Sequence, residues 1–507
     1  MFKWIDRWLN GITMYRLVLY YLIAIISGAV VLSFFKQVQY NALQIILSSL
    51  FLVAVCGLAN DLCGYIFKAP RNVESVFITA LILVLIVPPA QSVQGLVFLI
   101  VVGTLAMASK FILAINRKHI FNPAAIAVLI TSYGINQSAN WWVGTPLLAP
   151  IILIGGLLVV HRIQKFDLIF YFILSTASVS VLQALLTGGN VATLLNILFL
   201  HSSLLFFAFV MLTEPMTVPQ KYRWQIIYAV LLGFTFVPKV HIGDLYFSPE
   251  LALVIGNIFV YLVNPKRKQF LRLIEKVEVA PDLVDFVFEK DPGFNFTPGQ
   301  YMEWTYPHKN VDSRGNRRFL TIASSPTETN VRLGLKFYTQ GSSYKRAILN
   351  ITDKDTIVGD MLSGEFLLPA TQKKGKYVFI AGGIGITPFR SMLKYLTDMK
   401  IKQDIVLLYS NSFSEEVIYR DVFDAAAAQL GIKVIYCVTR ANNPVANPHF
   451  YFGRIDQELI AREIPDYPER TYYVSGSLRL VEGIKELLHT MGIKQSQTIT
   501  DFFPGLA

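Results

Sequence analysis

The clearest chemical signature in this sequence is a glycine-rich segment, Gly382-Gly-Ile-Gly-Ile-Thr-Pro388. It follows a predicted strand, Tyr377–Ala381, and precedes a predicted helix, Phe389–Lys400. Glycines let the backbone approach a ligand closely, and proline suits the first turn of a helix. The start of that helix offers unpaired N–H groups to an anion. The segment predicts a site for a phosphate or a nicotinamide, although such a turn can also be purely structural.

The elements around this segment predict two soluble domains. Residues 371–507 alternate strand and helix, which predicts an α/β parallel sheet with ligands at the carboxyl ends of its strands. Residues 266–370 contain short alternating strands and turn residues such as Pro281-Asp282, which predict a small antiparallel β-barrel.

Residues 1–265 have a different character, because long runs lack any Asp, Glu, Lys or Arg. A helix needs roughly 20 apolar residues to cross a bilayer, so the longer runs hold more than one crossing. We predict a polytopic all-α membrane bundle of about ten helices. The expected spans are 16–35, 42–66, 73–88, 94–115, 121–135, 147–161, 167–186, 195–213, 224–238 and 249–264.

The formal net charge of +11 is explained by membrane topology and not by nucleic acid. With the N-terminus inside, basic residues gather in the inner segments, and only Lys36 and Lys239 lie in outer ones. This positive-inside bias predicts a multi-pass protein of the cell inner (plasma) membrane with both termini cytoplasmic. The inner residues are Lys3, Arg7, Arg16, Lys68, Arg71, Arg117, Lys118, Arg162, Lys165, Lys221, Arg223, Lys266, Arg267 and Lys268.

The three cysteines give no metal site of their own. Cys56 and Cys63 lie on one predicted membrane helix, Cys437 lies on a distant strand, and no C-x-x-C occurs. A four-thiolate iron–sulfur or zinc site cannot be assembled from them. We expect buried structural thiols and no bound metal.

Five motifs make residues 268–507 resemble the ferredoxin–NADP reductase superfamily. In order, they are Phe296-Thr-Pro-Gly-Gln-Tyr301, Arg318–Pro326, Gly382–Pro388, Tyr473-Val-Ser-Gly-Ser477 and Asp501-Phe-Phe-Pro-Gly505. The resemblance implies an FAD-binding domain, then an NAD(P)-binding domain, and a membrane-bound flavoprotein oxidoreductase that uses NAD(P)H and FAD.

The resemblance also implies roles for individual residues. Arg318-Phe319-Leu320-Thr321 matches the FAD motif, with Arg318 on the pyrophosphate and Thr321 near the reactive nitrogen of the flavin. Gly341, Ser342 and Ser343 match a loop that holds the FAD phosphates; the alternative is a structural helix cap. Nucleotide contacts are assigned to Gly382, Gly383, Gly385, Thr387, Pro388, Arg440, Ser475 and Gly476, with Thr321 and Ser475 the catalytic candidates.

Three of these positions depart from the family pattern or leave it open. Leu320 replaces the usual Tyr, so stacking on that flavin face would need Phe319, Phe502 or Phe503. Ser475 stands where many relatives have Cys beside the nicotinamide. Thr439-Arg440 matches a 2′-phosphate site, but the choice between NADH and NADPH stays open.

Two proline signatures, Asn122-Pro-Ala-Ala125 and Thr213-Glu-Pro-Met-Thr217, make residues 15–265 resemble the RnfD/NqrB family of membrane subunits. Val87-Pro-Pro89 and Thr213-Glu-Pro215 end corresponding spans, as an inverted repeat predicts. Those relatives attach FMN covalently to a threonine; here Gly144-Thr145 and Gly189–Thr193 are only faint echoes. A noncovalent FMN or a quinone in the bundle is the preferred expectation.

Ionisable residues at membrane depth are functional candidates, and Asp61, His201 and Glu214 qualify. Asp61 is expected to pair with Lys68, whereas Glu214 is the better candidate for an ion or flavin site. The preferred function is electron transfer from NAD(P)H through FAD to a quinone, a membrane flavin or a partner electron-transfer protein. The alternatives are a redox-driven sodium or proton pump, a mere membrane anchor, and a haem-containing ferric reductase, which is disfavoured because only His201 lies well inside an expected span.

Overall fold

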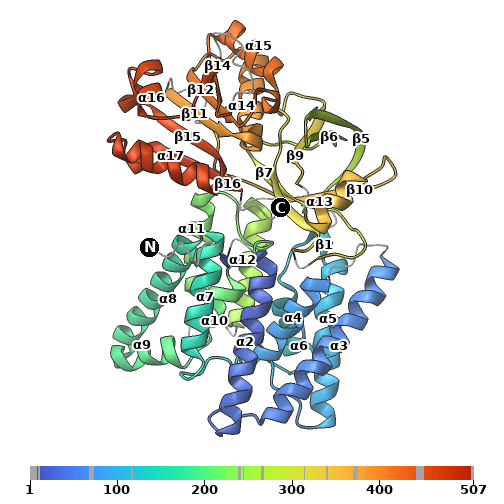
Figure 1. The fold of residues 1–507 in the computed structure, drawn as a ribbon. Helices are drawn as coiled ribbons and strands as arrows, with labels where there is room; N and C mark the ends of the chain where they lie inside the picture. Colours follow the sequence, from blue (N-terminus) through green and yellow to red (C-terminus); the bar gives the residue numbers. More distant parts are fainter. Residues whose placement is uncertain are drawn as a thin grey trace. The chain divides into compact units, whose positions relative to one another are not determined.

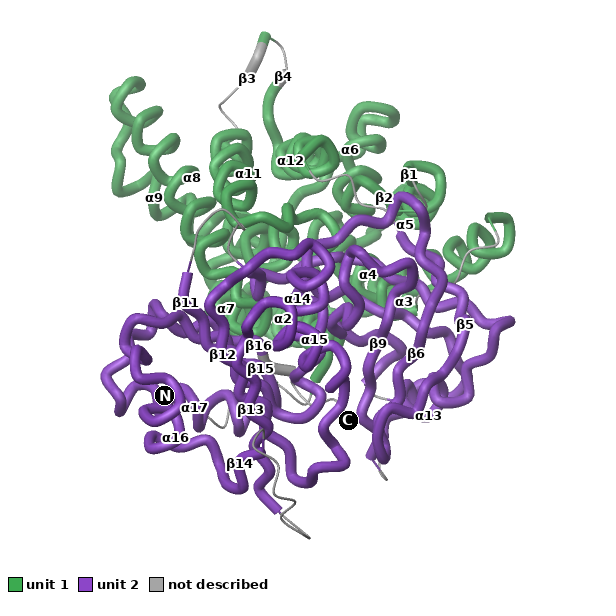
Figure 2. The backbone as a smooth tube through the Cα atoms, turned by 90° about the horizontal axis from the view of Figure 1, so that it is seen from above, with its two compact units in different colours: residues 1–267 green, residues 268–507 purple. Residues whose placement is uncertain are grey.

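The structure is a computed structural model and forms two compact units, residues 1–267 and 268–507 (Figure 2). It describes residues 8–9, 12–67, 73–115, 118–237, 241–243, 245–263, 268–312, 314–338, 341–368, 375–440 and 450–503. Several residues of the charge pattern and the motifs lie outside these ranges: Lys3, Arg7, Lys68, Arg71, Arg117, Lys239, Asn264, Lys266, Arg267, Pro504 and Gly505. The side chains of Phe502 and Phe503 are also not described.

Unit 1 is built from apolar helices that lie in the segments expected from the sequence (Figure 1). Asn41, Asn122 and Asn190 begin helices because each side chain accepts a hydrogen bond from a backbone N–H of the first turn. The helices are α2 Met14–Phe34, α3 Ala42–Ile66, α4 Val73–Ile86, α5 Val93–Ile112, α6 Pro123–Ile135, α7 Ala149–Ile163, α8 Phe166–Thr187, α9 Val191–Leu200, α10 Leu204–Phe206, the π-helix η1 Phe207–Met211, α11 Tyr222–Thr235 and α12 Pro249–Val263.

Four of the described helices, α2, α3, α5 and α8, are long and apolar enough to cross a membrane. A fifth span results if α9 and the α10–η1 segment, which are bent by 53° at a short break, are counted together. The other apolar helices are shorter, so the count of ten spans stays a prediction. His201 lies at this break and is exposed, and not well inside a continuous helix as the sequence suggested.

Small residues allow the helices of unit 1 to pack closely. A Cβ atom added to Gly155 would lie 2.3 Å from the ring of Tyr21, and one added to Gly156 would lie 2.3 Å from the ring of Phe209. Tyr21 also donates a 2.6 Å hydrogen bond from its hydroxyl to the carbonyl of Ile152. Glycine at a helix contact lets the two helix backbones approach closely.

The first half of unit 2 is a six-stranded antiparallel sheet in the order β8-β7-β10-β5-β6-β9. Its core contains the buried side chains of Phe286, Phe288 and Trp304. Closure of this sheet into a barrel, and a domain boundary near residue 370, stay predictions. The elements are β5 Gln269–Ala280, β6 Leu283–Glu289, β7 Tyr301–Thr305, β8 Arg317–Thr321, β9 Asn330–Lys336, α13 Ser343–Leu349 and β10 Thr356–Ser363.

The second half of unit 2 is a six-stranded parallel sheet in the order β14-β13-β12-β11-β15-β16, which confirms the predicted α/β architecture. Phe379, Phe389 and Tyr473 form an aromatic cluster in its core. The strands are β11 Lys376–Gly382, β12 Asp404–Asn411, β13 Lys433–Val438, β14 Phe450–Phe452, β15 Thr471–Ser477 and β16 Thr498–Phe503. The helices are α14 Thr387–Asp398, α15 Arg420–Leu430, α16 Gln457–Glu463 and α17 Leu478–Thr490.

Candidate functional site

The glycine-rich segment turns the chain sharply from β11 into α14. Gly382 ends the strand, Gly383–Ile386 forms a single 3₁₀ turn, and Pro388 occupies the first turn of α14. Gly383 has φ 53°, a conformation that favours glycine. A Cβ atom added to Gly385 would lie 2.6 Å from the Cα of Gly476 and from the carbonyl oxygen of Ser475. The structure therefore brings together the two nucleotide segments expected from the sequence.

Ser475 is fully buried, and its hydroxyl has no hydrogen-bond partner within the described chain. Its register partner on the neighbouring strand β16 is Asp501, whose Oδ2 also lacks a partner there. Burial raises the pKa of the Asp501 carboxyl to about 6. Asp501 was part of a sequence motif, but its burial and its place beside Ser475 depend on strand order, which the sequence does not reveal.

Thr321 lies at the end of β8 and presents a second buried hydroxyl without a partner among the described residues. Its register partner is Tyr301 on β7. Burial raises the pKa of Tyr301, and the nearby charges of Asp501 and Glu365 raise it further. The charge that acts on Tyr301 therefore includes that of Asp501, the register partner of Ser475.

Arg318 is buried on β8, with its guanidinium 5.0 Å from the ring centre of Tyr344. Its Nη1 donates to the carbonyls of Arg314, Gly315 and Arg317 at 2.6–3.2 Å. Its Nε and Nη2 have no partner in the described chain. Two buried N–H groups on one guanidinium are what a phosphate oxygen pair would satisfy.

The residues flanking Arg318 have different exposures. Phe319 is 41% exposed and packs edge-on against Tyr301, with ring centres 5.9 Å apart. Leu320 is half-buried, and its carbonyl accepts a 3.0 Å hydrogen bond from the Trp304 indole. Phe319 is therefore an exposed aromatic side chain beside Thr321. It is a candidate to stack on the flavin in place of the family's tyrosine, where this chain has Leu320.

The predicted phosphate loop makes several hydrogen bonds within the chain. Ser342 caps α13, and its hydroxyl accepts from the backbone N–H of Lys345. The Ser343 hydroxyl accepts from the Asp312 N–H at 2.9 Å, and the Ser343 N–H donates to Asp312 Oδ2 at 2.8 Å. The Gly341 N–H donates to the Tyr338 carbonyl. A phosphate role for this loop stays a prediction. Among the described residues here, the buried side-chain N–H groups without a partner are Nε and Nη2 of Arg318.

Lys345 is a candidate residue that the sequence analysis missed. Burial, together with the neighbouring positive charges of Arg318 and Arg314, lowers the pKa of its ammonium to about 8. Three cations thus gather around one region of α13 and β8. The Asp312 carboxylate, which pairs with Arg314 at 2.8 Å, balances part of this positive charge, and the remaining charge favours a further anion nearby.

Arg440, the predicted 2′-phosphate ligand, is exposed just beyond the end of β13. Its backbone N–H donates to the Ser412 carbonyl at 2.8 Å, so it lies beside the end of β12. This is the same carboxyl edge of the sheet that carries Gly382. Residues 441–449, which follow it, lie outside the described chain.

In unit 1, the two proline signatures meet. The Asn122 amide donates a 2.7 Å hydrogen bond to the Glu214 carboxylate, and the Asn122 backbone N–H donates to the Asn257 side-chain oxygen at 2.7 Å. The Thr217 hydroxyl also contacts Glu214, at 3.4 Å. A carboxylate is thus held among helices α6 and α12 and the segment after η1.

The other candidate residues of unit 1 are Asp61, Thr145 and the cysteines Cys56 and Cys63. Asp61 is exposed, and its expected partner Lys68 lies outside the described residues. Thr145, in the segment that faintly resembles an FMN-attachment site, has a buried hydroxyl without a partner within the described chain.

Cys56 and Cys437 are buried and Cys63 is partly buried, which fits structural thiols. Within the described residues, no group of three or more His, Cys, Asp or Glu could hold a metal ion.

Comparisons with known proteins concern residues of unit 2. Residues 379–486 match the family model of the oxidoreductase NAD-binding domain. The stachydrine N-demethylase reductase subunit of Rhizobium meliloti is 27% identical over 232 residues, which cover 45% of this chain and 64% of that protein. A flavohemoprotein of Pseudomonas putida is 24% identical over 241 residues, covering 46% and 58% respectively. The chain therefore spans about three-fifths of the length of these relatives.

Two solved structures give weaker overall similarity. The cytochrome b5 reductase domain of nitrate reductase from Ulva prolifera has a TM-score of 0.42 and 20% identity, covering 47% of this chain and 98% of that one. The Amycolatopsis cytochrome P450 reductase has a TM-score of 0.42 and 17% identity, covering 47% and 70%. Together with the family match, the sequence relatives show that the C-terminal half is similar to ferredoxin–NADP reductase-like domains, which supports the prediction of an NAD(P)H-dependent oxidoreductase.

Proposed function

We propose that the protein is a membrane-bound flavoprotein that passes electrons from NAD(P)H through FAD to an acceptor at the membrane. The observation that carries this proposal is the set of buried donors without partners, Arg318 Nε and Nη2 and the hydroxyls of Thr321 and Ser475. Buried polar groups in folded proteins are nearly always hydrogen-bonded, so these atoms fit the phosphates and ring edge of a bound dinucleotide.

The proposal gives each residue of the candidate site a separate role in binding or orienting the cofactors. Arg318 binds the FAD pyrophosphate, with Lys345 adding positive charge beside it, and Thr321 and Ser475 orient the reacting rings through their hydroxyls. The glycines of Gly382–Gly385 let the nicotinamide nucleotide approach the backbone. Burial raises the pKa of Asp501 to about 6, so its carboxyl takes up a proton as the pH falls below neutral. FAD, when bound, supplies hydride acceptance and the release of electrons one or two at a time.

Purification of the chain in detergent tests this proposal. Acid precipitation should release FAD and leave no flavin on the denatured chain, and anaerobic NADH or NADPH should bleach the bound flavin. Comparing the two nucleotides decides the cofactor preference near Arg440. Protein that binds no FAD, or whose flavin neither nucleotide reduces, would refute the proposal. Flavin fluorescence retained on the denatured chain would instead show covalent attachment.

For the membrane half, we propose a relationship to the RnfD/NqrB membrane subunits, with a quinone, a noncovalent flavin or a partner protein as acceptor. The support is the Asn122–Glu214 contact, which joins the two proline signatures of that resemblance. The same hydrogen-bonded carboxylate favours a second candidate function, redox-driven sodium or proton translocation. In vesicles, Glu214→Gln should then abolish NADH-dependent ion uptake while NADH oxidation by a soluble acceptor continues. Loss of both activities together would count against a separate ion role.

A haem-containing ferric reductase remains the disfavoured alternative, since His201 lies at an exposed helix break. Haem absorbance in the purified chain would reverse this ranking.

A further inference from the structure

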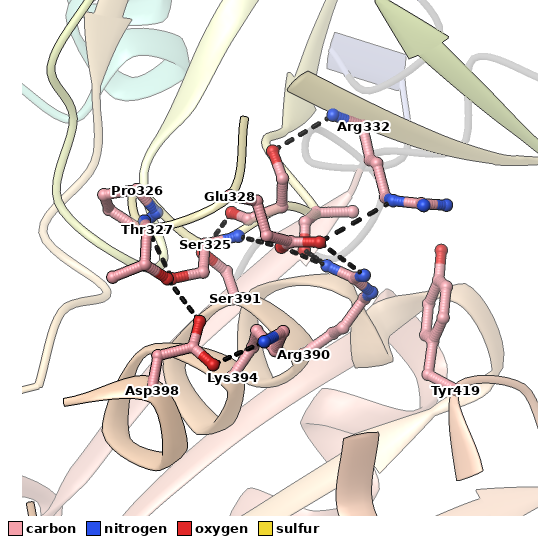
Figure 3. A network of polar contacts seen from close by, with 12 residues as sticks. Ser325, Pro326, Thr327, Glu328, Arg332, Arg390, Ser391, Lys394, Asp398 and Tyr419 are labelled. Atoms are coloured by element: carbon pink, nitrogen blue, oxygen red, sulfur yellow. Dashed lines mark hydrogen bonds and ion pairs between the residues drawn. The ribbon is translucent and has the colours of Figure 1, made fainter. Parts of the chain in front are cut away.

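A buried ionic network ties the two sheets of unit 2 together (Figure 3). Its centre is Arg390, in the first turn of α14, which is only 5% exposed. Its Nη1 and Nη2 donate to the two carboxylate oxygens of Glu328 at 2.8 and 3.0 Å. Glu328 lies between β8 and β9 of the antiparallel sheet, and it also accepts from the Ser325 N–H. A two-pronged arginine–carboxylate pair fixes orientation as well as distance.

An aromatic ring also packs against the flat face of the Arg390 guanidinium. The Tyr419 ring lies 5.1 Å from the guanidinium carbon, and the Tyr419 hydroxyl donates to Asp285 on β6. Tyr419 has φ 59°, a strained conformation for a residue with a side chain, so its position is determined by these contacts. A Cβ atom added to Gly334 on β9 would lie within 3.2 Å of Tyr419, Asp285 and Thr387, which shows how tightly the parts converge.

Two further hydrogen bonds reach the predicted flavin segment itself. Arg390 Nη1 donates to the carbonyl of Ala323 at 2.8 Å, and the Ser391 hydroxyl donates to the carbonyl of Ser324 at 2.7 Å. Ala323 follows Thr321 by two residues, and Arg390 follows Pro388 by two residues. The segment expected to contact the flavin and the turn expected to hold the nicotinamide are therefore joined directly, with almost no intervening chain.

We propose that Arg390 is a positioning residue that fixes the distance and angle at which the nicotinamide meets the flavin. This inference rests on the proposed function, because it assigns the two ligands to Thr321 and to the glycine turn. Arg390 contacts neither reacting ring; it acts through the backbone of Ala323 and through α14. Hydride transfer is sensitive to sub-ångström placement, so loosening this connection slows the transfer step more than it weakens binding.

Arg470 provides a matched control. It is 6% exposed and pairs with two carboxylates, Asp404 at 2.8 Å and Asp466 at 2.7 Å, but all of these contacts lie within the parallel-sheet half. Arg390→Met and Arg470→Met thus each remove one buried arginine and leave carboxylates behind. Only the first removes contacts between the two halves, namely those of Arg390 with Glu328 and Ala323.

The experiment uses the full chain in detergent, loaded with FAD, and measures anaerobic flavin reduction by stopped flow. Arg390→Met should lower the limiting reduction rate by about tenfold to a hundredfold. FAD content and nucleotide Kd should change by less than about threefold, and the long-wavelength nicotinamide–flavin absorbance should weaken. Arg470→Met should keep both the limiting rate and that absorbance. An unchanged limiting rate in Arg390→Met, or an equal loss in Arg470→Met, overturns the proposal.

A second measurement needs no flavin and separates this inference from the proposed function. Amide hydrogen exchange on the apo chain should accelerate in 321–325 and 384–391 in Arg390→Met and stay unchanged there in Arg470→Met. If wild-type flavin is not reduced by either nucleotide, the proposed function fails, while unaltered exchange in Arg390→Met refutes the mechanical connection. Should Arg390→Met not fold, Ser391→Ala is assayed in the same way, and an unchanged limiting rate again overturns the proposal.

Discussion

Replacing Lys345 by methionine is expected to stabilise the apo protein and to weaken its binding of FAD. The Lys345 ammonium donates to the Lys336 carbonyl at 2.8 Å and lies 4.7 Å from the ring centre of Tyr338. Burial lowers the pKa of Lys345 from 10.5 to about 8. At about 1.4 kcal/mol per pKa unit, the charged form costs the folded chain at most about 3.5 kcal/mol, and about 2 kcal/mol with solvent screening.

The sign of the pH dependence follows from these values. Because the folded pKa lies below the unfolded one, the penalty is complete below about pH 8, shrinks as the pH rises toward 10.5, and is absent above that. Lys345→Met should therefore gain about 2 kcal/mol at pH 7, and progressively less above pH 8. A bound pyrophosphate would favour the charged ammonium, so wild-type FAD affinity should fall as the pH rises through about 8, and the variant should lack this slope.

Thermal unfolding of the apo chain at pH 7 and pH 10 measures the first effect, and fluorescence titration of FAD across the same range measures the second. Lys354→Met, at an exposed position of the same unit, is the control and should change neither quantity. The reasoning is refuted if Lys345→Met is no more stable than the wild type at pH 7. It is also refuted if the variant keeps the wild-type pH dependence of FAD affinity.

Three other substitutions test separate features. Arg318→Met should raise the Kd for FAD at least about tenfold in calorimetric titration, because it removes the two free donors; an unchanged Kd would contradict the assignment. Asp501→Asn should stabilise the apo chain at pH 8 and much less at pH 4. The pKa of Asp501 is raised from 3.8 to about 6 in the folded chain, so its ionisation opposes folding increasingly between these pH values and fully above them. Equal effects on thermal unfolding at pH 4 and pH 8 would refute this. Gly156→Ala should destabilise the bundle by about 1–3 kcal/mol through its clash with Phe209, measured as aggregation on heating in detergent, whereas Gly134→Ala, with nothing within 4 Å, should be neutral.

The architecture of unit 2 could be predicted because its signals are local. Residues close together in the sequence determine the alternation of strand and helix after residue 375 and the turn at Gly382–Pro388. The structure contains the parallel sheet that this alternation predicts. The meeting of Gly385 with Gly476 was implied only by a family pattern. Strand order, which places Asp501 beside Ser475, depends on pairing over long separations and leaves no local trace.

The electrostatic details could not be predicted for the same reason. Lys345 looks like an ordinary helix lysine until Arg314 and Arg318 are placed beside it. Ser343 is predicted as a phosphate ligand, and that role stays a prediction; its hydrogen bonds with Asp312, 31 residues earlier, leave no trace in the local sequence. In unit 1, the apolar runs predict where the helices lie. No charged residue or proline stands at the break beside His201, so the local sequence does not predict it.

The contact between Gly385 and Gly476 has a consequence for how this site can evolve. At that point the boundary of the site consists of main chain, since any side chain at 385 would force the ends of β11 and β15 apart. Main-chain groups are the same for every amino acid, so substitutions nearby cannot change what this boundary offers. Under the proposed function, substitution at exposed positions such as Arg440 would alter nucleotide preference, while the main-chain boundary keeps its shape. The fold thus separates a part of the site that is free to diversify from a part that is not.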